Sequence, residues 1–174
     1  MELLEAIYTR RSIRQYLDRP VSEEAVRTIL SAAMMAPSAG NVQPWQFVVV
    51  TDPDQMNQVK DVHPYVGMAA SAPLGILVCG DLSLEKYPGF WVQDCSAAMQ
   101  NLLLAAHDLE LGAVWTGVHP VEERVERFRT IFELPEPVVP LGFAVIGWPV
   151  KPGRRKERYK VERIHQNRWQ GSDR

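Results

Sequence analysis

The sequence predicts a single α/β domain in which helices flank one mixed sheet. Segments with helical periodicity alternate with short apolar, β-branched segments, and this order favours layers of helix around a sheet. A chain of 174 residues can bury one good core but is short for separate cofactor and substrate lobes. Hydrophobic residues make up 46% and charged residues 23% of the chain, and these near-average values exclude a disordered or fibrous protein.

Two helices are expected at the start of the chain. Residues 2–9 carry apolar side chains at helical spacing and run into an arginine-rich stretch. In the second helix, Ser22 offers an N-cap, and Glu23 and Glu24 suit the positive end of the helix dipole. An apolar stripe follows on one face, and the helix is expected to end at Pro37.

Four strands and three more helices are expected after this point. Buried apolar runs predict strands at 45–51, 74–79, 113–118 and 139–147. Helical patterns are present at 52–60, 91–109 and 119–132. The last of these is expected to start at His119-Pro120, because proline is tolerated at the first helical position.

The chain beyond Trp148-Pro149 becomes charged and loses any core periodicity until Ile164 and Trp169. We therefore predict a C-terminal arm at 150–174 that reaches across a surface, and an arm of this kind usually needs a partner. The domain as a whole is expected to span residues 1–174.

Composition and charge exclude several classes of function. A net charge of −2 and a pI near 6.1 argue against nucleic-acid binding, because such domains are usually strongly basic. No apolar run approaches the length of a membrane span, and the first residues are acidic where a signal peptide is basic, so no membrane partner and a cytoplasmic location are expected. The histidines show no metal-ligand spacing, and Cys79 and Cys95 are expected to be ordinary buried thiols.

The stretch Arg10-Arg11-Ser12-Ile13-Arg14 carries the first candidate site. If it is extended, alternation places Arg10, Ser12 and Arg14 on one face. Two guanidinium groups beside a hydroxyl suit a phosphate or an electron-rich ring edge. The same residues are equally explained by cations gathering at the C-terminal end of a helix.

The loop at 36–47 is the second candidate. Its small residues and prolines let the backbone lie close to a flat ligand, and its side chains offer hydrogen bonds without charge. The alternative is a helix stop followed by a turn, since all these residue types are common in turns.

The strand end at Trp115-Thr116-Gly117-Val118 is the third candidate. Gly117 lets another group approach the backbone, and neither a phosphate-binding P-loop nor a G-x-G-x-x-G fingerprint is present in the chain. A basic cluster starts the arm, comprising Arg154, Arg155, Lys156 and Arg158. Solvated tail charge is its simplest explanation, and a binding role requires that the arm fold back toward Arg10.

These residues resemble the nitroreductase superfamily over nearly the whole chain. The shared features are Glu5-Ala6-Ile7 leading into 10–14, the loop at 36–45, the helix end at Leu111-Gly112, the turn at Thr116-Gly117, and Ile146-Gly147-Trp148-Pro149 before a basic arm. The resemblance implies an intertwined homodimer with two FMN sites at the subunit interface, each built from both chains. The arm is then expected to pack on the partner subunit.

Candidate FMN contacts follow from the resemblance by position. Arg10, Ser12 and Arg14 are expected to hold the phosphate, ribityl chain and pyrimidine edge, with Arg14 nearest the ring. The contacts expected from the partner subunit are Pro37, Ser38, Ala39 and Asn41. Thr116 and Gly117 are expected beside N5 of the ring, and Lys156 and Arg158 at the phosphate, with Arg155 as a competing assignment. Arg11 and Gln43 complete the set of candidates.

One region departs from the family's pattern. Larger relatives often place a polar or basic residue against the ring just before the second strand, where this chain reads Tyr65-Val66-Gly67-Met68.

The resemblance also implies an enzyme, an FMN-dependent oxidoreductase with NAD(P)H as a transient co-substrate. It is expected to reduce small organic acceptors such as nitroaromatics or quinones by a ping-pong mechanism. The flavin then carries the chemistry, with electrostatic support from Arg14 and without a catalytic side chain or a metal. Two alternatives are a specialised flavin reaction, such as reductive dehalogenation, and a non-catalytic flavin-binding sensor.

Overall fold

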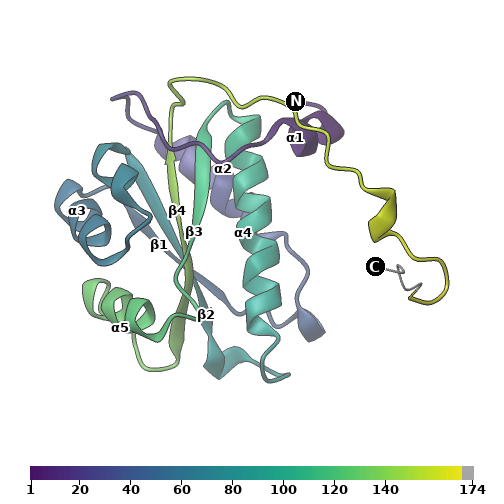
Figure 1. The fold of residues 1–174 in the computed structure, drawn as a ribbon. Helices are drawn as coiled ribbons and strands as arrows, with labels where there is room; N and C mark the ends of the chain where they lie inside the picture. The colour runs from purple at the N-terminus through teal and green to yellow at the C-terminus, as the bar shows by residue number, and fades with distance from the viewer. Residues whose placement is uncertain (170–174) are drawn as a thin grey trace.

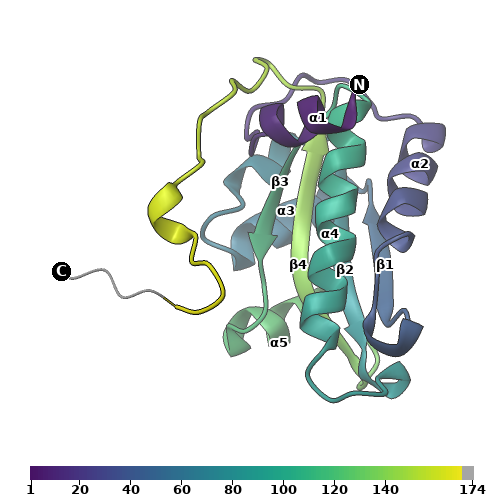
Figure 2. The same ribbon diagram turned by 90° about the vertical axis from the view of Figure 1, so that its right-hand side faces the viewer.

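The computed structural model describes residues 1–169, and in them a four-stranded sheet is covered by helices on both faces (Figures 1 and 2). The strands are β1 (Trp45–Val50), β2 (Leu74–Asp81), β3 (Gly112–Gly117) and β4 (Val138–Gly147). Their order is β1-β2-β4-β3, with antiparallel pairing between all neighbours. Parallel pairing within the described part of the chain is confined to a bridge between Ser12 and Ala113. The expected α/β class, with helices flanking one sheet, is confirmed, and the sheet itself is antiparallel rather than mixed.

Five α-helices surround this sheet in residues 1–169. They are α1 (Leu3–Thr9), α2 (Glu23–Met34), α3 (Pro53–Val62), α4 (Trp91–Asp108) and α5 (Glu122–Ile131). Figure 1 shows α2 and α4 on one face of the sheet, and α3 and α5 on the other. Helix α1 lies against the C-terminal half of α4, where the Thr9 hydroxyl is 2.8 Å from Nε2 of His107.

A local signal explains where α2 begins. The Ser22 side chain accepts a hydrogen bond from the Ala25 N–H, as its N-cap role predicts. The expected start of α5 at Pro120 is wrong, because α5 begins at Glu122. The N–H groups of Val118 and His119 both donate to the Leu141 carbonyl, which holds the chain in a turn at the end of β3 and delays the helix.

The two cysteines are buried in the core, as expected. Cys79 lies on β2, and Cys95 on α4 donates its thiol to the Cys79 carbonyl at 3.4 Å. Burial raises the pKa of each thiol to about 12, so both are protonated and unreactive at neutral pH.

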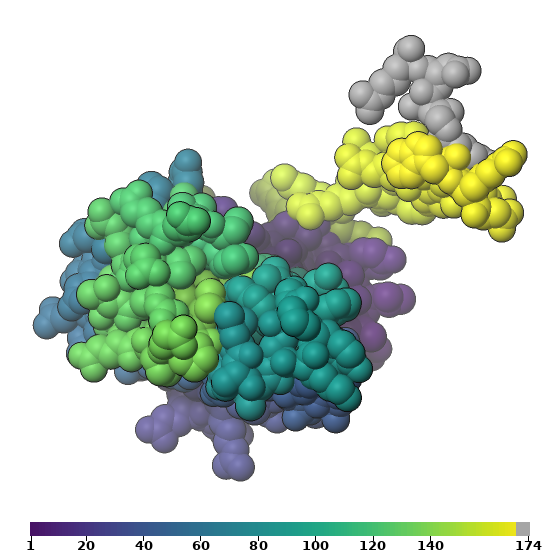
Figure 3. All heavy atoms as spheres, turned by 90° about the horizontal axis from the view of Figure 1, so that it is seen from below, coloured from purple at the N-terminus to yellow at the C-terminus, as the bar shows by residue number. Residues whose placement is uncertain are grey.

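The chain beyond β4 contains little regular structure in the part that is described. Residues 150–169 run past α1 and then away from the body, with one short 3₁₀ turn at Val161–Arg163 (Figures 1 and 3). Tyr159, Val161 and Trp169 are at least two-thirds exposed, at 74%, 69% and 81%. The last five residues of the predicted arm, 170–174, lie outside the described residues. Among residues 1–169, no helix combines the length and apolarity that a bilayer span requires.

Two histidines make the stability of this fold depend on pH. Burial lowers the pKa of His63, and burial followed by the charge of Arg10 lowers that of His107. The unfolded chain, in which a histidine has a pKa of about 6.5, therefore binds protons more readily than the folded chain. We predict that the free energy of unfolding decreases as the pH falls below about 6.5 toward the lowered folded values.

Urea unfolding at about pH 7 and about pH 5 measures this effect. The double variant His63→Gln, His107→Gln should lose less stability than the wild type over that interval. An equal loss in both proteins would contradict the assignment to these two side chains.

Candidate active site

A hollow of about 630 Å³ lies between the end of α1, the middle of α4 and the start of the arm. Its basic lining residues are Arg10, Arg11, Arg155, Lys156 and Arg158. The arm therefore folds back toward Arg10, which is the condition that a binding role for its basic cluster requires. The volume of the hollow falls in the range of small-molecule binding sites.

The positive charge in this hollow is only partly compensated by nearby carboxylates, since Glu157 attracts Arg155 but lies among five basic side chains. Burial lowers the pKa of Arg10, and the charges of Arg11 and Arg158 lower it further. None of the basic lining side chains forms an ion pair within residues 1–169. Glu157 also borders the hollow, but its carboxylate accepts the N–H groups of Arg158 and Tyr159. An anion such as a phosphate would relieve this repulsion.

Arg10 and Arg11 have different roles in the structure. The Arg11 guanidinium donates to the carbonyls of Tyr8 and Arg10, and its stem leaves no room for a Cβ at Gly153. Arg11 thus ties the C-terminal end of α1 to the arm, as the alternative of cations at a helix end predicts. Arg10 remains available to a ligand.

The side chains after Arg11 alternate as expected for an extended segment. The Ile13 N–H donates to the Ala113 carbonyl at 3.0 Å, and the Ile13 side chain packs against Gly112. Ser12 and Arg14 are exposed on the opposite side.

A second hollow, of about 420 Å³, lies at the end of β3. It is bordered by Trp115, Gly117 and His119, and by Val92 and Ser96 of α4. Gln100, one turn further along α4, borders the basic hollow. Because Val92, Ser96 and Gln100 are four residues apart, they share one face of the helix over about 12 Å. The two hollows therefore lie along one track, with a basic end and a mainly uncharged end.

Thr116 points away from this track. Its side chain is only 6% exposed, and its hydroxyl donates to the Phe143 carbonyl at 2.7 Å. Trp115 and Gly117 face the α4 side instead, as alternation along a strand requires. Thr116 can therefore contact a ligand only through its backbone.

The loop around Ser38 lies apart from both hollows. Its candidate residues are Pro37, Ser38, Ala39, Asn41 and Gln43. The Ser38 hydroxyl accepts the Gln43 N–H, and the buried carboxylate of Asp94 accepts the Ala39 N–H, both at 3.0 Å. In Figure 2 this loop lies on the opposite side of α4 from the arm. One chain thus brings together Arg10, Arg11, Lys156 and Arg158, but not the loop.

Several further residues border or support the track and were not among the candidates predicted from the sequence. Ser96 and Gln100 had a detectable signal, since they are polar residues four apart on a largely apolar helix. His63 had none, because a single histidine without ligand spacing gives no pattern, yet it contacts the Gly117 carbonyl at 2.8 Å. No group of three metal-ligating side chains occurs in residues 1–169.

Comparisons with known proteins identify the family of this chain. The model of the nitroreductase family matches residues 7–70 and 61–148. A Methanothermobacter thermautotrophicus protein, provisionally named NADH dehydrogenase/NAD(P)H nitroreductase, is 52% identical over 97% of this chain and 88% of its own length. The FMN reductase [NAD(P)H] of Bacillus subtilis is 28% identical over 99% of this chain and 76% of its own length.

A solved structure supports the same assignment. A protein of Desulfovibrio desulfuricans, provisionally named nitroreductase and crystallised in complex with FMN, superposes with a TM-score of 0.84. It is 34% identical, and the match covers 98% of this chain and 99% of that one. The fold, the family model and the sequence identity agree, and the chain belongs to the nitroreductase family.

Proposed function

We propose that this chain is an FMN-dependent oxidoreductase that passes electrons from NADH or NADPH to small organic acceptors such as nitroaromatics or quinones. The observation that carries the proposal is the basic hollow at Arg10, whose basic side chains form no ion pair within residues 1–169, continued along α4 to the open end of β3. A track of this form suits an elongated ligand with a phosphate at one end and a flat ring at the other. The FMN complex of the similar Desulfovibrio protein supports the choice of ligand.

Each residue has a proposed role along the track. Arg10, Lys156 and Arg158 hold the phosphate, with Arg155 as the competing contact, and Ser12 meets the ribityl chain. Arg14, Gly117 and the Thr116 backbone lie at the ring. When bound, FMN would supply the redox chemistry between NAD(P)H and the acceptor, for which we propose a ping-pong order. The fixed charge of Arg14 stabilises negative charge at the ring without reorganisation.

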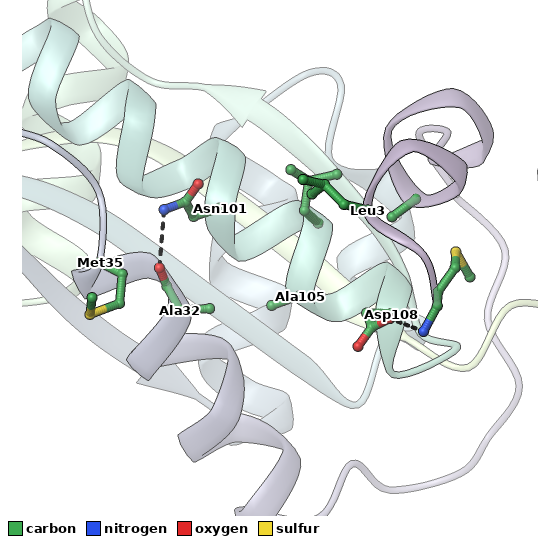
Figure 4. A pocket seen from close by; sticks show the side chains of 9 residues that line it. Leu3, Ala32, Met35, Asn101, Ala105 and Asp108 are labelled. Atoms are coloured by element: carbon green, nitrogen blue, oxygen red, sulfur yellow. Dashed lines mark hydrogen bonds and ion pairs between the residues drawn. The ribbon is translucent and has the colours of Figure 1, made fainter.

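A second copy of the chain completes the proposed site. A groove of about 470 Å³ between α1, α2 and α4 has apolar walls that include Leu3, Met35 and Ala105 (Figure 4). Leu3 and Met35 are 68% and 79% exposed, and such a contiguous apolar surface is typical of an interface. In the proposed homodimer the loop of Ser38 reaches the partner's track, and the arm packs on the partner subunit.

The first test of the function is an absorption spectrum of the protein with FMN. We expect flavin bands that NADH or NADPH bleaches under anaerobic conditions and that a nitroaromatic or quinone restores. Bands that resist both donors would favour a non-catalytic flavin sensor instead. A protein that fails to take up FMN would contradict the central proposal.

The phosphate role of Arg10 predicts a selective loss of affinity. Arg10→Gln should weaken FMN binding about 10- to 100-fold, because it removes a charge-assisted hydrogen bond. Riboflavin lacks the phosphate, so its affinity should barely change. Fluorescence titration of both ligands measures the difference. Arg127→Gln removes the same charge from the outer face of α5, where Arg127 pairs with Glu123, and is the matched control.

If Arg14 lies at the flavin ring, its loss should affect FMN and riboflavin alike, in contrast to the loss of Arg10. Arg14→Ala should weaken FMN and riboflavin to a similar extent and make the bound flavin harder to reduce, because a positive charge near the ring is lost. Titration and a measured midpoint potential test this. Unchanged affinity and potential would remove Arg14 from the site.

The proposed interface predicts a dimer that dissociates when one charged side chain is introduced into the apolar groove. Sedimentation should give about twice the chain mass of 19.7 kDa for the wild type. Met35→Glu should give a monomer, because it places an unpaired charge in an apolar contact. Val121→Glu is the matched control, since Val121 is an exposed apolar residue outside the groove. A Met35→Glu protein that stays dimeric would place the interface elsewhere.

A further inference from the structure

His63 connects the end of α3 to the end of β3. Its side chain is 2% exposed, and its Nε2 lies 2.8 Å from the carbonyl oxygen of Gly117. The imidazole packs edge-on against Phe128 of α5, with ring centroids 6.3 Å apart. A buried histidine from one layer therefore meets the strand end that borders the second hollow.

The contacts of His63 fix which nitrogen carries the proton. Nδ1 accepts the backbone N–H of Tyr65 at 3.2 Å, so it has no proton in the neutral ring. Nε2 then carries the hydrogen and donates it to the Gly117 carbonyl. The orientation and the tautomer of the imidazole are thus determined by the backbone on both sides.

The Gly117 carbonyl also accepts a second hydrogen bond. Nη1 of Arg124 donates to the same oxygen at 3.1 Å. A carbonyl oxygen has two lone pairs, so His63 and Arg124 together use the full acceptor capacity of Gly117. The Gly117 N–H is not used by these contacts. Alternation along β3 places it on the outer edge of the sheet, as it places the Ala113 carbonyl that bonds to Ile13.

We propose that His63 is a positioning residue, which with Arg124 holds the Gly117 carbonyl and so restrains the Gly117 backbone, leaving its N–H as a hydrogen-bond donor to the flavin ring. The inference rests on the proposed FMN site. Gly117 lies at the edge of the sheet, where β4 holds it on one side only, and no atom lies within 4 Å of the position that a Cβ would take there. The two side-chain donors supply the restraint that a neighbouring strand would otherwise provide.

Two variants separate this role from simple filling of the core. Asparagine can keep the acceptor for the Tyr65 N–H, but its amide is too short to reach the Gly117 carbonyl. Glutamine places its amide nitrogen at nearly the reach of Nε2. His63→Asn should therefore lose the bond to Gly117, and His63→Gln should restore it. Phe128→Leu is the control for general loss of packing around the imidazole.

The first measurement uses the protein without FMN. Amide hydrogen exchange in the segment 115–119 should be faster in His63→Asn than in the wild type or in His63→Gln, because the end of β3 opens more often. Unchanged exchange in His63→Asn would overturn the inference.

The second measurement is FMN affinity by titration. His63→Asn should bind about tenfold more weakly, as expected for one lost hydrogen bond from a buried group, and His63→Gln should stay close to the wild type. Phe128→Leu should lower the melting temperature without this loss of affinity.

Three affinity results would also overturn the inference about His63: wild-type affinity in His63→Asn, an equal loss in His63→Gln, or an equal loss in Phe128→Leu. A wild-type protein that takes up no FMN would defeat the proposed function instead, and amide exchange would still test the contact between His63 and Gly117.

Discussion

The antiparallel pairing of β2 with β4 determines where every other element lies. Residues 74–80 and 140–147 are all buried, so both strands have apolar surface on both faces of the sheet. Such strands are stable only with a layer of helices on each side. Helices α2 and α4 form one layer, and α3 and α5 form the other. The remaining strands, β1 and β3, are left at the edges. Because β2 and β4 occupy the centre of the sheet, β3 lies at an edge, and its end at Gly117 is open.

Much of this fold could be predicted from the sequence because its signals are local. Apolar runs located all four strands, and Ser22 marked the start of α2 through its own hydrogen bond. The start of α5 could not be predicted in this way. Pro120 is compatible with a first helical turn, but the turn before α5 depends on the Leu141 carbonyl, which belongs to a strand about twenty residues away in the sequence.

The candidate site could be predicted only in part, for a similar reason. Residue types and the family resemblance identified Arg10, Lys156 and Arg158, and the structure places them around one hollow. The sequence could not show that Arg11 ties α1 to the arm, because this role depends on the contact of Arg11 with Gly153. Nor could it orient Thr116, whose side chain follows from the register of β3 on β4.

The charge in the basic hollow connects folding to ligand binding. Burial and then the like charges of Arg11 and Arg158 lower the pKa of Arg10, so the folded chain contains repulsion that an extended chain would not have. A dianionic phosphate bound there replaces repulsion with attraction, and a ligand that binds only the folded state stabilises it. The loop that we propose to come from the partner subunit would likewise couple folding to ligand binding. The loop of Ser38 lies across α4 from the basic hollow of its own chain, so in the proposed site the loop would come from a second folded chain. Ligand, fold and assembly are then expected to stabilise one another.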